Sequence, residues 1–237
     1  RHCPYCQGGR RGCGKSPTID PCGFGRGKGR KGGVQPAFNI ECSFTCDEEI
    51  GGQLGAGYII RKGLVNADYI VNGEGGSVLD VGVGHNGALW LNLTVHGKAA
   101  HGSRPQEGVN AFEKMVDLVT TLQPLKRQLD APGRAFITPG GQERHPTMSR
   151  GGVFPGTDRD KVNTVPAQAT FSIDRRILPN ERLADAEREI RTAIAKLCRS
   201  DPQLKVDVNT ALQITPCMVQ PAHPFPQAFA QAVRNVR

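Results

Sequence analysis

Hydrophobic and polar residues alternate along the first regular segment of the chain, residues 38–46. This two-residue period predicts a β-strand. A helix is predicted from about residue 53 to 62, with Gly63 as its stop, and the apolar run 67–71 predicts a second strand. A strand, a helix and a strand over this length form a βαβ unit, which favours an α/β domain with a parallel sheet.

A different set of patterns follows between residues 85 and 213. Apolar residues at helical spacing predict amphipathic helices over about 109–122 and 183–197. Four strands are expected at residues 89–96, 135–138, 167–173 and 204–208. The order β-α-β-β-α-β is that of a ferredoxin-like α+β sandwich, with two helices on one face of an antiparallel sheet.

The sandwich is expected to be an insertion that interrupts the first domain. We expect residues 34–84 to form the first part of the α/β domain, residues 85–213 to form the inserted domain, and residues 214–237 to return to the first. In this last segment Pro224 marks a helix start.

Residues 1–33 differ from the rest in composition. They contain ten glycines and eight basic residues against one acidic residue, so they carry +7 of the chain's formal charge of +8. Two interpretations remain open. Cys3, Cys6, Cys13 and Cys22 could form a small zinc knuckle beside a basic tail, which would make the protein bind nucleic acid. Alternatively the segment is foreign to the fold, through disorder or a frame error in its coding region.

No run of about 18 apolar residues occurs, so no membrane-spanning segment is predicted. The first residues also lack the apolar stretch of a secretory signal. The cysteines do not form the regular framework of a disulfide-stabilised secreted protein. A cytoplasmic protein is therefore expected.

Acidic residues follow both predicted strands of the first domain. Glu48 and Glu49 come after the first strand, and Glu74 comes after the second. In parallel sheets, ligands bind beyond the carboxyl ends of the strands. Carboxylates combined with histidines suit zinc, and a neighbouring carboxylate can act as a general base. A solvated acidic loop is the alternative interpretation.

Several motifs occur in the order found in one enzyme family. They are residues 44–52 (FTCDEEIGG), 72–74 (NGE), 97–105 (GKAAHGSRP), 108–111 (GVNA), 163–166 (NTVP) and 173–176 (IDRR). Together they resemble the zinc aminoacylases and carboxypeptidases, a family that includes acetylornithine deacetylase, succinyl-diaminopimelate desuccinylase and carboxypeptidase G. The resemblance implies a zinc-hydrolase catalytic domain with an inserted lid and dimerisation domain.

The resemblance implies roles for six residues. Glu48 would be the general base, and Glu49 and Glu74 would each bind one of two zinc ions, with Co²⁺ or Mn²⁺ as alternatives. His101 on the lid would stabilise the oxyanion in the partner subunit's site, and Asn163 would hydrogen-bond near the reacting group. Arg176 would bind the substrate carboxylate. Alternatively His101 is an exposed loop residue, Asn163 a turn residue and Arg176 a surface charge.

The family pattern is incomplete in this chain. The family has a His-x-Asp segment and a bridging aspartate before the Asp-Glu-Glu segment, where this chain has only His2 and Asp20. A further histidine ligand should come after residue 237. The remaining histidines, His85, His96, His145 and His223, fit no motif and are expected to be structural or solvated.

The sequence therefore predicts a homodimeric, metal-dependent hydrolase that cleaves the amide bond of N-acyl amino acids or related peptides. The chain alone is expected to be inactive because ligands are missing. A non-catalytic, dimerising relic of the family and a nucleic-acid-binding protein are the alternatives.

Overall fold

The computed structural model describes residues 24–25, 41–73, 80–151 and 161–235. The chain divides into two compact units, Arg1–Ile70 and Val71–Arg237. Each unit is described by itself.

The first unit contains few regular elements. Strand β1 (Phe24–Gly25) pairs with β2 (Cys42–Ser43), and the pairing is antiparallel. A 3-10 turn, η1 (Glu48–Ile50), and one short helix, α1 (Ala56–Arg61), follow.

The predicted parallel βαβ unit is wrong for the described part of this unit. Residues 67–71 form no strand, and only Cys42–Ser43 of the predicted first strand is paired, while residues 38–40 lie outside the described part. The helix predicted from 53 to 62 begins three residues later. The physical reason is that a strand needs neighbours on its edge and its face. Phe44 is 74% exposed and Ile70 is 70% exposed, so the described residues supply no layer on which the apolar side chains of the predicted strands could pack.

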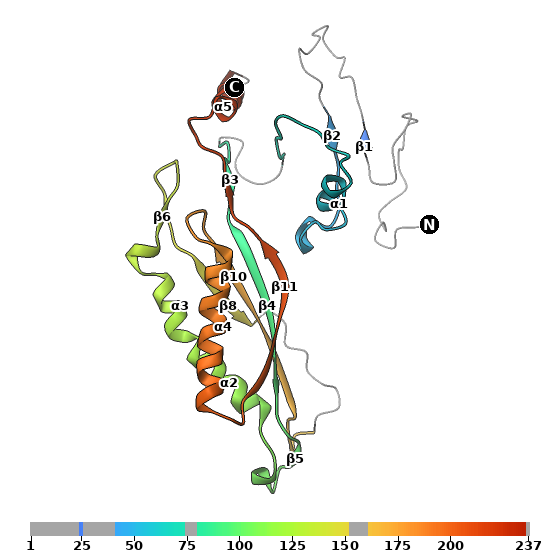
Figure 1. Ribbon diagram of the computed structural model, residues 1–237, viewed down its shortest axis with the longest axis vertical. Coiled ribbons are helices and arrows are strands. Elements are labelled where there is room, and N and C mark those ends of the chain that lie inside the picture. The colour runs from blue at the N-terminus through green and yellow to red at the C-terminus, as the bar shows by residue number, and fades with distance from the viewer. Residues whose placement is uncertain (1–23, 26–40, 74–79, 152–160, 236–237) are drawn as a thin grey trace. The chain divides into compact units, whose positions relative to one another are not determined.

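The second unit is built on a four-stranded antiparallel sheet (Figure 1). Its strands are β4 (Gly87–His96), β8 (Thr147–Gly151), β10 (Gln168–Ile177) and β11 (Lys205–Ile214). They lie in the order β11-β4-β10-β8. Helices α2 (Ala111–Thr121), α3 (Gln123–Leu129) and α4 (Leu183–Ser200) complete this ferredoxin-like βαββαβ arrangement.

One strand of the sheet differs from the prediction. Residues 135–138 were expected to supply the second strand, but they contain β6 (Phe136–Ile137), which pairs outside the sheet with β7 (Glu143–Arg144). The sheet uses β8 instead. Because β8 is an edge strand and Met148 is its one fully buried residue, it has no clear apolar alternation.

The core lies between the sheet and the helices. Leu89, Leu91, Leu93 and Val95 of β4 are all 0% exposed. Ile190 of α4 and Leu118 of α2 belong to the same buried cluster. Each fully buried aliphatic side chain contributes about 1.5–3 kcal/mol of hydrophobic stabilisation, so this cluster fixes the sheet against the helices.

The sheet has two distinct ends. At one end Gly87 of β4 pairs with Ile177 of β10, and Ile214 of β11 pairs with Ala88. The chain therefore enters and leaves the sandwich at this end, where β3 (Gly84–His85) pairs with β12 (Cys217–Met218). At the opposite end, which we call the distal end, β5 (Ala100–His101) pairs with β9 (Thr164–Val165).

Two 3-10 turns and one further helix complete the described elements. The turns are η2 (Pro105–Glu107) and η3 (Pro132–Arg134). The helix predicted to start at Pro224 is confirmed as α5 (Pro224–Asn235). Among the described residues, none of the helices combines the length and the apolar character needed to cross a lipid bilayer.

Candidate functional site

The distal end of the sandwich brings His101 and Asn163 together. His101 lies on β5 opposite Thr164 of β9, and the backbone N–H of Gly102 donates to the Asn163 carbonyl at 2.7 Å. A Cβ atom on residue 102 would lie 2.9 Å from that oxygen. Glycine at this position therefore allows the two segments to approach, although they are far apart in the sequence.

His101 is held by the turn that follows it. Its Nδ1 lies 2.8 Å from Ser103 Oγ and 3.2 Å from the Ser103 backbone nitrogen. The Arg104 N–H donates to the His101 carbonyl at 2.8 Å. The imidazole is exposed, and its Nε2 has no hydrogen-bond partner within the described part of the chain. A ring fixed through one nitrogen with the other nitrogen open can donate a hydrogen bond to a ligand.

Arg176 lies at the other end of the sheet. It is near the end of β10, opposite Ala88 of β4 and Thr147 of β8. Its Nε and Nη2 donate to Asp174 Oδ2 at 3.1 and 3.0 Å. Eight residues of extended strand separate Arg176 from Gln168, so the two ends lie about 26 Å apart. The structure therefore does not bring Arg176 to His101 and Asn163 within one sandwich.

The acidic triplet occupies a tight turn of the first unit. Asp47 adopts a left-handed conformation with φ of 66°, and its Oδ2 accepts the Leu54 N–H at 2.7 Å. Its carbonyl accepts the N–H of Gly52 at 2.8 Å. Glu48 and Glu49 follow in η1 with exposed side chains. The turn thus presents both carboxylates to solvent, while Glu74 lies outside the described residues.

A complete metal site is not formed by the described residues. In residues 41–73, 80–151 and 161–235, no group of three His, Cys, Asp or Glu side chains could hold a metal ion. The described part of the chain therefore does not suffice for the expected two zinc ions. The cysteines predicted as an alternative zinc knuckle, Cys3, Cys6, Cys13 and Cys22, lie outside the described residues.

The other histidines serve local hydrogen bonds. His96 Nε2 lies 2.8 Å from Asp207 Oδ2, and His145 Nε2 lies 3.0 Å from Glu143 Oε1. His85 Nδ1 faces the Asn86 carbonyl at 3.0 Å, and His223 Nδ1 accepts the Phe225 N–H at 3.2 Å. The expectation that these histidines are structural or solvated stays a prediction, and each of them contacts a polar atom of the protein.

A buried ion pair beside Arg176 was missed in the sequence. The Arg175 side chain is 2% exposed, and its Nη2 donates to Glu181 Oε1 at 2.6 Å. Its Nη1 donates to the Arg176 carbonyl and to Glu181 Oε2. Position 175 continues the inward-facing series of Phe171 and Ile173, so the alternation already indicated that this arginine is buried.

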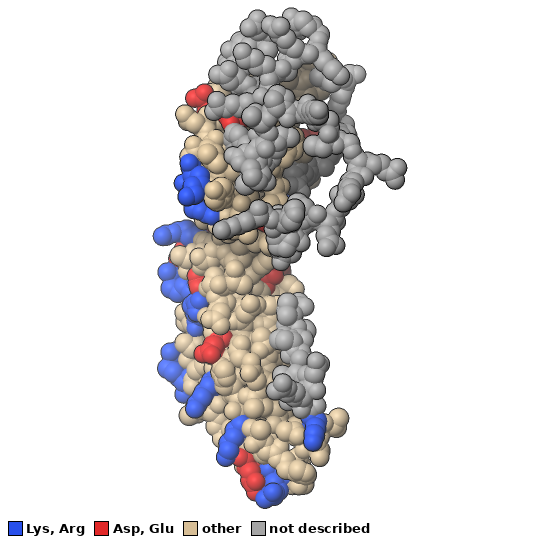
Figure 2. Space-filling view, turned by 90° about the vertical axis from the view of Figure 1, so that its right-hand side faces the viewer, with Lys and Arg blue, Asp and Glu red and all other residues tan. Residues whose placement is uncertain are grey.

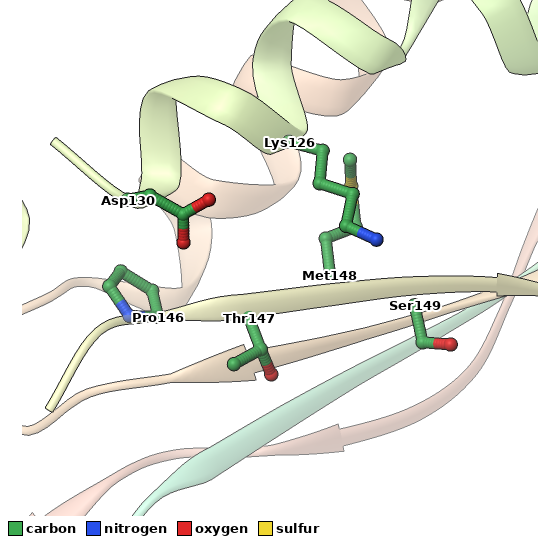
Figure 3. Close-up of a pocket in the computed structure, with 6 residues that line it drawn as sticks. All are labelled: Lys126, Asp130, Pro146, Thr147, Met148 and Ser149. Carbon is green, nitrogen blue, oxygen red and sulfur yellow. The ribbon is translucent and has the colours of Figure 1, made fainter.

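A cavity of about 320 Å³ lies between α3 and β8, and Figure 3 shows the side chains around it. It is lined by Lys126, Asp130, Pro146, Thr147, Met148 and Ser149. Lys126 of α3 and Asp130, the C-cap residue of that helix, lie about one helical turn apart and point toward β8 (Figure 3). Neither side chain forms an ion pair with another described residue. None of the predicted site residues lines this cavity.

Basic side chains line one side of the view in Figure 2, with acidic ones among them. On α4, Arg188 pairs with Asp185, and Arg191 pairs with Glu187 at 2.7 Å. These arginines therefore have acidic partners, unlike an open nucleic-acid-binding patch. The nucleic-acid alternative rests on residues 1–33, of which only 24–25 are described.

Comparison with known proteins finds similarity over the sandwich. Residues 83–202 match the family described as "Peptidase dimerisation domain". An acetylornithine deacetylase from Aliivibrio fischeri is 31% identical over 153 residues, covering 65% of this chain and 38% of that protein. An uncharacterized metallohydrolase from Methanocaldococcus jannaschii is 26% identical, covering 64% of this chain and 37% of that protein. This chain therefore spans less than two fifths of the length of these relatives.

A solved structure shares the fold. The aminopeptidase PepT from Bacillus cereus superposes with a TM-score of 0.54 at 18% identity. The superposition covers 78% of this chain and 45% of the aminopeptidase.

Proposed function

This chain belongs to the family of peptidase dimerisation domains, and from this premise we propose that it is part of a metal-dependent hydrolase that cleaves amide bonds of N-acyl amino acids or related peptides. The relatives named as a deacetylase and as a metallohydrolase support this reaction class and its metal requirement. We propose residues 34–84 and 214–237 as parts of the catalytic domain and residues 85–213 as the inserted lid.

In this proposal the chain's own residues divide the work of hydrolysis. Glu48 takes the proton from the attacking water and returns it to the leaving nitrogen. His101 and Asn163 donate hydrogen bonds to the oxyanion that develops on the carbonyl oxygen. Arg176 binds the substrate carboxylate, for which its planar guanidinium offers two parallel donors. Glu49 and Glu74 are the proposed metal ligands, and the described residues alone do not complete the metal site.

The separation of the two ends of the sheet is the observation that carries this proposal. An extended N-acyl amino acid spans about 7 Å, whereas Arg176 lies about 26 Å from the distal end by strand rise. One substrate therefore cannot reach both ends of the same sandwich. We propose that Arg176 serves the site of its own subunit, and that His101 and Asn163 serve the partner's site.

The proposed partner is a second copy, paired along the edge of β8. This edge strand has β10 on one side only, and an unpaired edge is a template for another strand. Lys126 and Asp130 lie above it with opposite charges. In a two-fold dimer each residue meets its counterpart reciprocally, so Lys126 would face Asp130 of the second copy. Phe112 and Val116, which are 55% and 45% exposed on α2, supply apolar area for such a contact.

A chimeric enzyme tests the proposed function. The region of the Aliivibrio fischeri deacetylase that corresponds to residues 41–214 is replaced by those residues, and release of acetate from N-acetyl amino acids is measured with zinc present. We expect activity from the chimera and none from the 237-residue chain alone. A folded, dimeric, zinc-loaded chimera without activity would contradict the proposal. A second chimera carrying only residues 83–214 keeps the test valid if the longer one does not fold.

One alternative is a non-catalytic relic that only dimerises. The observation that favours it is the lack of a three-ligand metal group in the described part of the chain. Zinc content and hydrolysis separate the two proposals, because a relic would dimerise in the chimera but would remain inactive there.

A further inference from the structure

Ser103 directs two hydrogen-bond donors at one nitrogen of His101. Its backbone nitrogen lies 3.2 Å from His101 Nδ1, and its Oγ lies 2.8 Å from the same atom. Ser103 makes both contacts from within a turn, which is closed by the hydrogen bond from the Arg104 N–H to the His101 carbonyl. The position of the imidazole is therefore tied to Ser103.

The backbone contact decides which imidazole nitrogen carries the proton. A backbone N–H can only donate, so Nδ1 must accept and cannot carry a proton in the neutral ring. The serine hydroxyl rotates freely and can donate to the same lone pair. The proton of neutral His101 then lies on Nε2, which has no partner within the described residues.

We propose that Ser103 is a positioning residue that holds neutral His101 as the Nε2–H tautomer, with this N–H available to the substrate oxyanion. The inference rests on the proposed function of His101 as an oxyanion donor. The opposite tautomer would place a lone pair on Nε2, and a lone pair cannot stabilise a developing negative charge. The hydrogen bond made by one ring nitrogen sets the role of the other.

The tautomer can be measured in the chain itself, without activity. A nitrogen-15 correlation spectrum of histidine side chains distinguishes protonated from unprotonated ring nitrogens. It is recorded at about pH 8.5, where a histidine of ordinary pKa is neutral. His101 is identified by the signals lost in His101→Ala. His85 provides an internal reference, because its Nδ1 faces a carbonyl oxygen, which can only accept, and must therefore carry the proton.

We expect unprotonated Nδ1 and protonated Nε2 for His101, and the reverse for His85. Ser103→Ala keeps the backbone N–H at 3.2 Å but removes the shorter hydroxyl contact at 2.8 Å. The remaining single contact holds the tautomer less firmly, so the His101 signals should move part of the way toward those of a mixture of tautomers. Ser103→Thr should restore the pattern, and Ser149→Ala, which removes a serine hydroxyl from β8, should change nothing. A protonated Nδ1 on His101, or identical His101 signals in wild type and Ser103→Ala, would overturn the inference.

Turnover of the chimera separates this inference from the proposed function. Ser103→Ala should lower kcat about 2- to 10-fold, the effect of one lost hydrogen bond, with KM unchanged. If His101→Ala abolishes turnover but the spectra show no fixed tautomer, only the role of Ser103 fails. If the tautomer is fixed but His101→Ala leaves turnover unchanged, the proposed role of His101 fails instead.

Discussion

Replacing Glu181 with alanine should destabilise the sandwich because the Arg175 guanidinium would stay buried without its carboxylate. Arg175 is 2% exposed, and Glu181 accepts hydrogen bonds from it at 2.6 and 3.2 Å. Glu181 also accepts the backbone N–H of Leu178 at 3.0 Å. Together with the contact from Arg134 Nη1 at 3.4 Å, the substitution removes four hydrogen bonds and the one negative charge beside the buried guanidinium.

The expected loss follows from the burial of Arg175. Removing one partner of a buried ion pair costs about 3–5 kcal/mol in the free energy of unfolding. Arg134 also contacts Glu181, at 3.4 Å, but its side chain is 30% exposed. Arg134 also forms an ion pair with Glu189 at 2.5 Å, so Arg134→Ala removes two partly exposed pairs. It serves as the comparison and should cost about 2 kcal/mol or less, at up to about 1 kcal/mol for each pair.

Urea unfolding followed by tryptophan fluorescence measures this loss. Trp90 is the one tryptophan of the chain and lies in β4 opposite Asp174, so it reports on the sheet. With a urea dependence of about 1–3 kcal/mol per molar, the midpoint should fall by at least about 1 M. A loss in Glu181→Ala no larger than that in Arg134→Ala would refute the reasoning. Glu181→Ala combined with Arg175→Met should recover part of the loss, because no unpaired charge remains.

Three further sets of substitutions test other parts of the structure. Asn110 accepts the N–H groups of Phe112 and Glu113 at the start of α2, so thermal unfolding should show a loss of about 1 kcal/mol in Asn110→Ala and little change in Asn110→Ser. The Lys114 side chain donates a hydrogen bond to Asp201 at 2.6 Å and lowers the pKa of that carboxyl. A pKa that is lower in the folded protein than in the unfolded chain stabilises the protein at pH values above the ordinary aspartate pKa. This stabilisation is lost as the pH falls through the lowered pKa. Lys114→Met should therefore be less stable than wild type at pH 7, and the difference should begin to shrink below about pH 4 and vanish once the pH is below the lowered pKa of Asp201; an equal difference at pH 7 and in acid would contradict this. Lys126→Asp and Asp130→Lys should each weaken self-association in sedimentation, and an equal mixture should form heterodimers, because both cross-dimer charge pairs are then restored. Monomers in the mixture would exclude the β8 interface.

The sandwich could be predicted from the sequence where burial and strand period agree. In β4, residues 89–96 alternate because one face packs on helices and the other does not. The same rule failed for residues 67–71, where Tyr69, Ile70 and Val71 are exposed and the described residues supply no layer to cover them. It also missed β8, because an edge strand needs little apolar character to pair.

The candidate site was predictable only as a set of residues. The motifs name His101, Asn163 and Arg176 but contain no information on which of them meet. The ladder between β5 and β9 pairs His101 with Thr164, and the Gly102 N–H beside it bonds to the Asn163 carbonyl. The register of β10 places Arg176 at the other end of the sheet. Both facts depend on pairing between distant segments. The hydrogen bonds from Ser103 to His101 depend in the same way on a turn geometry that the sequence alone does not specify.

Complementation between two inactive variants of the chimera tests the central claim, which is that His101 acts across a dimer. Glu48→Ala removes the general base and His101→Ala removes the oxyanion donor, so each homodimer should be nearly inactive. A mixed dimer has one site with both defects and one site with neither. After statistical subunit exchange, half the dimers are mixed, and the mixture should regain about a quarter of the unmodified activity. No recovery, with exchange confirmed independently, would contradict the claim and would mean that His101 acts within its own subunit or not at all.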